Sequence, residues 1–188
     1  MLASDAPSNP DRRRLLKRGV FGGALLLVGG GGALALRSTL VRRPPAHPLK
    51  LLTVDEHAVF AAVAARFAPG DGAAASWPTT DALDCAGKVD ALMATVQPAV
   101  GAEFRQLLGL FESALFGLVV TGTPTPFTRL SPAEQDARLE AWHHSRLALL
   151  RSGYQALRRL CHATYYSSPE VYALMGYPGP PEVPRGPA

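Results

Sequence analysis

Apolar residues recur every three or four positions along most of this 188-residue chain, and this spacing limits its fold more than any other feature. The first such stretch opens with Thr53 and Glu56, which have the spacing of a capping box at a helix start. No stretch of useful length alternates apolar and polar residues, as a half-buried strand would. The sequence therefore predicts an all-α fold, a small bundle of five to six helices within residues 52–177.

Interruptions of this spacing give the expected bounds of the first three helices. The first ends at Pro69-Gly70, and the second spans residues 81–96. The third begins at Pro98 and continues through Leu118. The apolar residues expected to face the core are Leu83, Val89, Leu92 and Met93 in the second helix, and Phe104, Leu107, Leu108, Phe111, Leu115 and Leu118 in the third.

The carboxyl-terminal half follows the same pattern. Residues 121–126, TGTPTP, cannot continue a helix and predict a surface loop. A second capping box at 131–134 opens a helical stretch that reaches Tyr166, and its length predicts a break near His144-Ser145. A last short helix is expected to be capped by Ser168-Pro169-Glu170 and to end at Gly176.

The positive charge of the chain is concentrated at its amino terminus. Residues 1–43 hold eight Lys/Arg and two Asp, whereas the remainder holds eleven basic and thirteen acidic residues. A body with a net charge of −2 presents no basic surface for a phosphate backbone, so we expect no nucleic-acid partner.

Residues 1–35 have the composition of an export signal. The stretch Gly19–Leu36 is eighteen residues long and carries no charge, but seven of its residues are glycine. Ala33 and Ala35 provide an Ala-x-Ala pattern, which predicts cleavage after Ala35. The alternative is an uncleaved anchor in the inner membrane, since the stretch is only slightly shorter than a bilayer span of about 20 residues. Residues 36–51 then form a linker.

The basic part of this segment resembles the twin-arginine consensus. Its matching residues are Arg12, Arg13, Leu15, Leu16 and Lys17. Asp11 stands where Ser or Thr is usual, and the alternative is a generic basic region of a signal. The match predicts export to the periplasm by the twin-arginine translocase. That pathway carries folded proteins, usually because a cofactor is inserted in the cytoplasm.

The chain itself presents no cofactor or nucleophile motif. It lacks a Gly-x-Gly-x-x-Gly or Gly-x-x-x-x-Gly-Lys loop, and Cys161-His162 is only the end of a haem-attachment pattern. Adjacent helix positions point about 100° apart, so His143 and His144 are not expected to share a metal ion. With no Gly-x-Ser-x-Gly elbow either, the sequence favours a chain without catalytic, cofactor-binding or metal-binding residues.

Tyrosine is concentrated near the carboxyl terminus. Four of the five tyrosines fall within thirteen residues: Tyr165, Tyr166, Tyr172 and Tyr177. Tyrosine is enriched at protein interfaces, but an aromatic cluster that packs the last helix onto its own bundle is an equal alternative. The tail at 178–188, PGPPEVPRGPA, has too little apolar content to fold by itself.

Three stretches together resemble the gluconate 2-dehydrogenase subunit 3 family. They are LTVDEHAVFAAVAARFAPGDG, LSPAEQDARLEAW and, most specifically, YYSSPEVYALMGYPGP. The similarity covers roughly residues 52–180. It implies a small helical companion of an FAD-dependent dehydrogenase of the glucose–methanol–choline type, with the FAD on that large subunit and a cytochrome c as a further candidate subunit.

The resemblance also implies a role for the chain. A non-catalytic subunit of this kind carries the export signal for a flavoprotein that has none, and so escorts, exports and stabilises it. The alternative is a stand-alone helical binding protein, exported or membrane-anchored. The residues that we expect to contact the partner are Tyr165, Tyr166, Ser168, Pro169, Glu170, Tyr172, Tyr177 and Cys161.

The two cysteines leave several arrangements open in an oxidising compartment: an internal bridge, a bridge to a partner, or two buried thiols. Cys85 lies beside Ala86 in the second expected helix, a position that suits a small buried residue. Cys161 lies four residues before the tyrosine cluster. We therefore expect Cys85 to pack inside the bundle and Cys161 to lie close to the partner.

Overall fold

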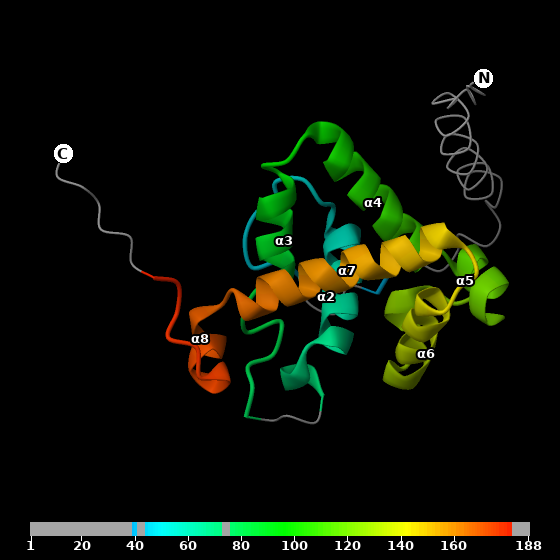
Figure 1. Ribbon diagram of the computed structural model, residues 1–188. Helices are drawn as coiled ribbons and strands as arrows, with labels where there is room; N and C mark the ends of the chain where they lie inside the picture. The colour runs from blue at the N-terminus through cyan, green and yellow to red at the C-terminus, as the bar shows by residue number, and fades with distance from the viewer. Residues whose placement is uncertain (1–38, 41–43, 73–75, 182–188) are drawn as a thin grey trace, which may run out of the picture.

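The computed structural model describes residues 39–40, 44–72 and 76–181, and these contain seven α-helices and no strand (Figure 1). The all-α prediction is confirmed. The α-helices are α2 (Val54–Phe67), α3 (Cys85–Met93), α4 (Pro98–Glu112), α5 (Ala114–Thr121), α6 (Pro132–His143), α7 (Ala148–Tyr166) and α8 (Pro169–Tyr172). Three 3-10 turns accompany them: η1 (Pro69–Asp71), η2 (Phe127–Arg129) and η3 (Ala173–Met175).

Helix α2 occupies the centre of the bundle. It packs against α3, α4, α6 and α7, and the nineteen-residue α7 crosses it (Figure 1). Helices α5 and α6 lie toward the start of α7, and α8 lies at its end. The side chains of Phe60, Val63, Val89, Leu108 and Leu157, drawn from four helices, are fully buried. Their burial supplies the hydrophobic stabilisation that individual helices of this length lack.

The amino-terminal capping box of α2 forms as the sequence predicts. Thr53 Oγ1 accepts a hydrogen bond from the Glu56 backbone N–H at 3.2 Å, and the Glu56 carboxylate accepts one from the Thr53 N–H at 2.8 Å. The helix ends at Phe67, directly before Ala68 and Pro69, because the residue before a proline favours extended backbone.

The second helix is shorter than the predicted range of 81–96. It begins only at Cys85, since Asp84 has a left-handed backbone with φ of 48° that cannot lie within a right-handed helix. The Asp84 carboxylate instead caps the helix by accepting from the Gly87 N–H. Leu92, expected on the apolar stripe, is 43 % exposed, so this part of the stripe was predicted wrongly.

The third predicted helix is two helices in the structure. Helix α4 ends at Glu112, and α5 leaves it at an angle of 64°. Ser113 lies at the break with extended backbone, and its hydroxyl caps α5 by accepting from the Phe116 N–H. The predicted helix through Leu118 is therefore wrong at this point, and the Leu118 side chain is 42 % exposed.

The later boundaries agree better with the sequence. Ser131 and Glu134 form the second capping box, and the chain breaks after His143 before α7 begins at Ala148. Gly176, with φ of 68°, ends the last turn. Among the described helices, no single helix is long and apolar enough to span a membrane. The bent pair α4–α5 reaches the required length and apolar content only when its two helices are taken together.

Candidate partner-binding site

The tyrosine cluster divides into a buried and an exposed part. Tyr165 is 1 % exposed, stacks on Trp77 and donates a hydrogen bond from its hydroxyl to the Pro78 carbonyl oxygen at 2.7 Å. Its ring therefore anchors the end of α7 to the 77–78 segment. Tyr165 thus packs the end of α7 onto its own bundle, as the packing alternative predicts. Its burial leaves little surface for the expected partner contact, which stays a prediction. Tyr166, half-buried, lies edge-on to it at a centroid distance of 5.2 Å.

Cys161 and Ser168 are also interior residues. Cys161 is 3 % exposed within the main core, and Cys85, 1 % exposed, packs inside the bundle as predicted. The expected closeness of Cys161 to the partner stays a prediction. Ser168 occupies the position before α8, but its hydroxyl does not cap that helix. It accepts instead from Lys88 Nζ at 2.7 Å and donates to the Thr164 carbonyl oxygen. These contacts join α3, α7 and α8.

The other residues expected at the contact, together with the exposed Leu174 and Met175, form a surface that is here called the carboxyl-terminal surface. It consists of Pro169, Glu170, Tyr172, Leu174, Met175 and Tyr177. Leu174, Met175 and Tyr177 are each more than 40 % exposed. Tyr172 donates from its hydroxyl to the Ser167 carbonyl oxygen at 2.9 Å and lies edge-on to Tyr177. A turn fixed in this way presents large apolar side chains to solvent, which is characteristic of a contact surface.

A second apolar surface, the α4–α7 groove, was missed by the sequence analysis. It encloses about 460 Å³ and is lined mainly by apolar side chains, including Val100, Leu107, Leu110 and Leu160. At its floor the helices approach so closely that a Cβ on Gly153 would lie 2.8 Å from Leu107 Cδ1. The two walls of this groove come from separate helices, α4 and α7, so the periodicity of either helix alone does not indicate the groove. Gly153 was the sequence signal of their close approach.

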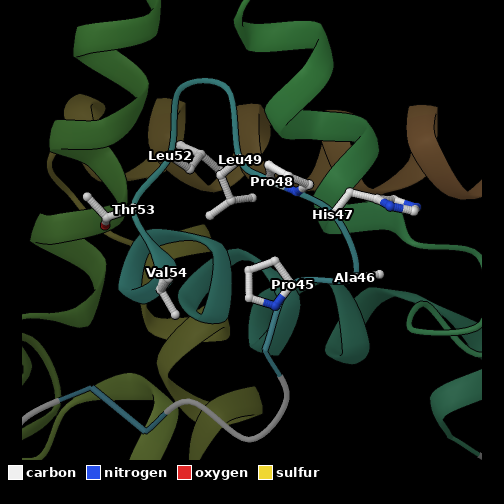
Figure 2. Close-up of a pocket in the computed structure, with 8 residues that line it drawn as sticks. All are labelled: Pro45, Ala46, His47, Pro48, Leu49, Leu52, Thr53 and Val54. Atoms are coloured by element: carbon white, nitrogen blue, oxygen red, sulfur yellow. The ribbon is translucent and has the colours of Figure 1, made fainter.

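The segment before α2 forms a shallow hollow of about 500 Å³ (Figure 2). Pro45, Leu49 and Val54 line it with apolar side chains, and the His47 ring points away from them (Figure 2). Thr53 contributes a hydroxyl that already caps α2.

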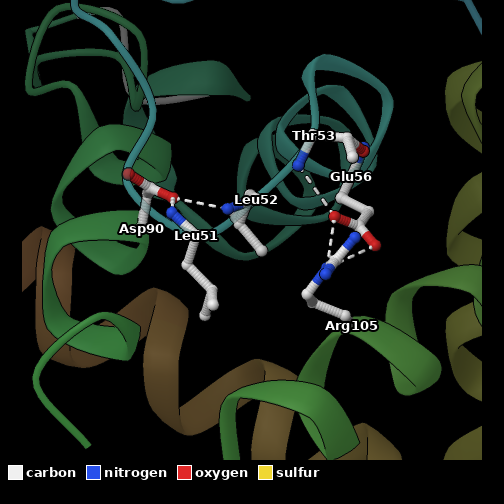
Figure 3. A network of polar contacts seen from close by, with 6 residues as sticks. All are labelled: Leu51, Leu52, Thr53, Glu56, Asp90 and Arg105. Carbon is white, nitrogen blue, oxygen red and sulfur yellow. Dashed lines mark hydrogen bonds and ion pairs between the residues drawn. The ribbon is translucent and has the colours of Figure 1, made fainter. Parts of the chain in front are cut away.

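A carboxylate and an ion pair fasten the same segment to the bundle (Figure 3). Asp90 of α3, 3 % exposed, accepts from the backbone N–H groups of Lys50, Leu51 and Leu52 at 2.7, 2.9 and 2.7 Å. The Glu56 carboxylate, besides capping α2, accepts from Arg105 Nε of α4 at 2.9 Å. Any signal carried by the preceding residues is thus attached to a firmly held segment.

A polar cleft of about 500 Å³ lies between α2 and the 80–85 turn. His57 lines it, and neither of its ring nitrogens meets a hydrogen-bond partner among the described residues. Burial lowers the pKa of His57, although Asp84, Asp90 and Asp81 oppose this, so the ring is neutral near pH 7. Cys85 also lines the cleft, but burial raises its pKa and keeps it a protonated, poorly nucleophilic thiol.

The described residues form a small all-helical protein with two apolar surfaces, the carboxyl-terminal surface and the α4–α7 groove, each suited to contact with another protein. The family model for gluconate 2-dehydrogenase subunit 3 matches residues 54–179, and the chain belongs to this family. Membership implies a subunit of that dehydrogenase complex. No curated protein and no solved structure matches the chain. The resemblance noted in the sequence is thereby confirmed.

The signal residues Arg12, Arg13, Leu15, Leu16, Lys17, Ala33 and Ala35 lie outside the described residues.

Proposed function

We propose that this chain is the non-catalytic small subunit of a periplasmic FAD-dependent dehydrogenase, which it escorts, exports and stabilises. The family match over residues 54–179 carries the proposal, because that family is a small subunit of a dehydrogenase complex. The twin-arginine pattern at residues 12–17 of the same chain supports the export role. In this proposal the FAD is held by the large subunit, and a cytochrome c subunit receives the electrons.

The carboxyl-terminal surface is the proposed contact with the flavoprotein. It belongs to the most family-specific stretch of the sequence, and it exposes Leu174, Met175 and Tyr177 around a turn held by Tyr172. Tyrosine and methionine are enriched at protein interfaces, and tyrosine is frequent among the residues that supply most of the binding free energy. Tyr165 packs in one buried cluster with Val171 of α8, which attaches the helix next to this surface to the end of α7.

The contact can be tested by co-expressing the chain with a large flavoprotein encoded beside it that lacks its own export signal, and purifying through a tag on this chain. We expect the double variant Leu174→Ser/Tyr177→Ser to retain at least about tenfold less flavoprotein, while its helical circular dichroism is unchanged. Val119→Ser is the matched control, since Val119 is 75 % exposed on α5, outside the surface. Undiminished recovery with the double variant would refute the proposed contact.

The same experiment also tests the α4–α7 groove as the alternative contact with the flavoprotein. Val100 is 45 % exposed at the groove, so Val100→Asp places a charge on apolar lining without removing a buried side chain. We expect this variant to retain the flavoprotein. If it alone loses the partner, the groove and not the carboxyl-terminal surface is the contact.

The export role has a separate test. Arg12→Lys/Arg13→Lys keeps the charge but removes the paired guanidinium groups that Lys cannot imitate. We expect both this chain and the flavoprotein to accumulate in the cytoplasm, whereas an Arg18→Lys control is exported. Normal periplasmic levels of the double variant would exclude the twin-arginine route.

A further inference from the structure

Two imidazoles and a carboxylate gather at the carboxyl end of α6. His144 Nε2 lies 2.6 Å from Glu140 Oε1, and His143 Nδ1 lies 3.9 Å from Glu140 Oε2. One ligand atom from each of the three residues lies within 4.8 Å of those of the other two. The side chains are partly or largely exposed, so they are open to an ion from solvent.

Helical spacing around Glu140 explains this convergence, which was not predicted from the sequence. Glu140 and His143 lie three residues apart on α6 and therefore share a face. His144, the C-cap residue, still donates its backbone N–H to the Glu140 carbonyl oxygen at 3.0 Å and therefore lies one helical turn beyond Glu140. The Glu140 carboxylate thus reaches both imidazoles, whose ring centroids are 4.5 Å apart.

Contacts from α7 hold the group in place. The His143 ring stacks on Tyr154 at a centroid distance of 4.5 Å and an interplanar angle of 16°. Arg151 donates to the Ser145 carbonyl oxygen at 2.6 Å and so fixes the turn that follows the histidines. Ligand side chains that are already oriented lose less conformational entropy when an ion binds.

The donor set defines the class of ion. Imidazole nitrogens with a carboxylate suit Zn²⁺, Cu²⁺ and Ni²⁺, whereas Ca²⁺ and Mg²⁺ require mostly oxygen ligands. Two donors at about 2.1 Å from one tetrahedral Zn²⁺ lie about 3.4 Å apart. The three donor atoms lie within 4.8 Å of one another, so ion binding requires side-chain rotations that close this cluster and open the 2.6 Å hydrogen bond between His144 and Glu140. The carboxyl end of a helix further favours a cation.

We propose that Glu140, His143 and His144 form a binding site for one divalent transition-metal ion of the Zn²⁺ or Cu²⁺ type, with water in the remaining positions. The bound ion joins the last turn of α6 to the turn that leads into α7. This site does not depend on the proposed function, because its ligands lie outside the carboxyl-terminal surface.

Calorimetric titration of the full chain with Zn²⁺, and separately with Cu²⁺, tests the site. We expect one ion per chain, and at least about tenfold weaker binding in both His144→Gln and Glu140→Gln. His47→Gln is the matched control, because His47 is a single exposed imidazole elsewhere, and it should bind as the wild type does.

A spectroscopic readout separates coordination from a structural role. The electron paramagnetic resonance spectrum of the Cu²⁺ complex should show coupling to two imidazole nitrogens in the wild type and to one in His144→Gln. Zn²⁺ should raise the melting temperature of the wild type but not of His144→Gln. A stoichiometry below one, or binding that His144→Gln leaves unchanged, would overturn the proposal.

Discussion

Asp90 shows how one side chain joins two parts of this molecule. Burial by itself would raise the pKa of Asp90, but three backbone N–H donors from Leu52, Lys50 and Leu51 outweigh it and lower the pKa. The ionised carboxylate is thus the form that the folded state stabilises. Its contribution to stability is present above the ordinary Asp pKa of 3.8 and is lost as pH falls through the lower folded value.

We predict that Asp90→Asn lowers the free energy of unfolding by about 2–3 kcal/mol at pH 7, since an amide replaces a charged acceptor of three hydrogen bonds. Urea denaturation measures this difference. The exposed Glu103→Gln on α4 is the control and should change the value by less than about 0.5 kcal/mol. An equal effect in the two variants would show that the three hydrogen bonds contribute little.

His57 gives a second pH-dependent contribution at the residue scale. Because burial lowers the pKa of the folded-state ring below 6.5, protonation favours the unfolded chain. We predict that stability is constant above about pH 6.5 and decreases as pH falls below it toward the folded pKa. His57→Leu should flatten this part of the profile, and the exposed His47→Leu should not. A profile unchanged by His57→Leu would contradict the assignment.

At the scale of elements, the packing of α5 against α6 depends on one buried guanidinium. Arg138 of α6 is 1 % exposed and donates to the carbonyl oxygens of Thr125 and Thr123 at 2.9 and 3.1 Å. It thereby holds the loop that links α5 to η2. Gly117 of α5 leaves room for this side chain, because a Cβ there would collide with the Arg138 guanidinium.

We predict that Gly117→Ala destabilises the protein by about 1–3 kcal/mol, because the added methyl group displaces Arg138 from the loop carbonyls. Gly109→Ala in α4 is the matched control. Nothing lies within 4 Å of a Cβ at that position, so alanine should stabilise the helix by about 0.4–1 kcal/mol. Thermal unfolding of the two variants should shift in opposite directions, and a shared direction would refute this explanation.

At the scale of the whole molecule, the packing of α3 against α7 encloses both thiols. Burial is the largest influence on each and raises the pKa of Cys85 and of Cys161, so thiolate is scarce at neutral pH. We predict that neither thiol reacts with iodoacetamide in the folded protein, and that both react in urea. Mass spectrometry of the non-reduced, exported protein should find both thiols free. A peptide linked through Cys85 and Cys161 would contradict this prediction.

The sequence by itself determined the elements whose signals are local. The capping boxes at Thr53 and Ser131 fixed two helix starts, since both partners of each hydrogen bond lie within four residues. The break after His143 and the end at Gly176 also follow from residues nearby in the chain. The YYSSPEVYALMGYPGP stretch indicated the family, because a motif requires no knowledge of spatial neighbours.

Only the tertiary structure decided which residues of that motif face solvent. Tyr165 and Tyr177 are the same residue type in the same motif, yet Trp77, about ninety positions away, covers one and leaves the other exposed. The 64° break at Ser113 and the burial of Cys161 likewise depend on neighbouring helices. Side-chain burial is set by distances across the fold, whereas helical periodicity indicates only the face of the helix on which each residue lies.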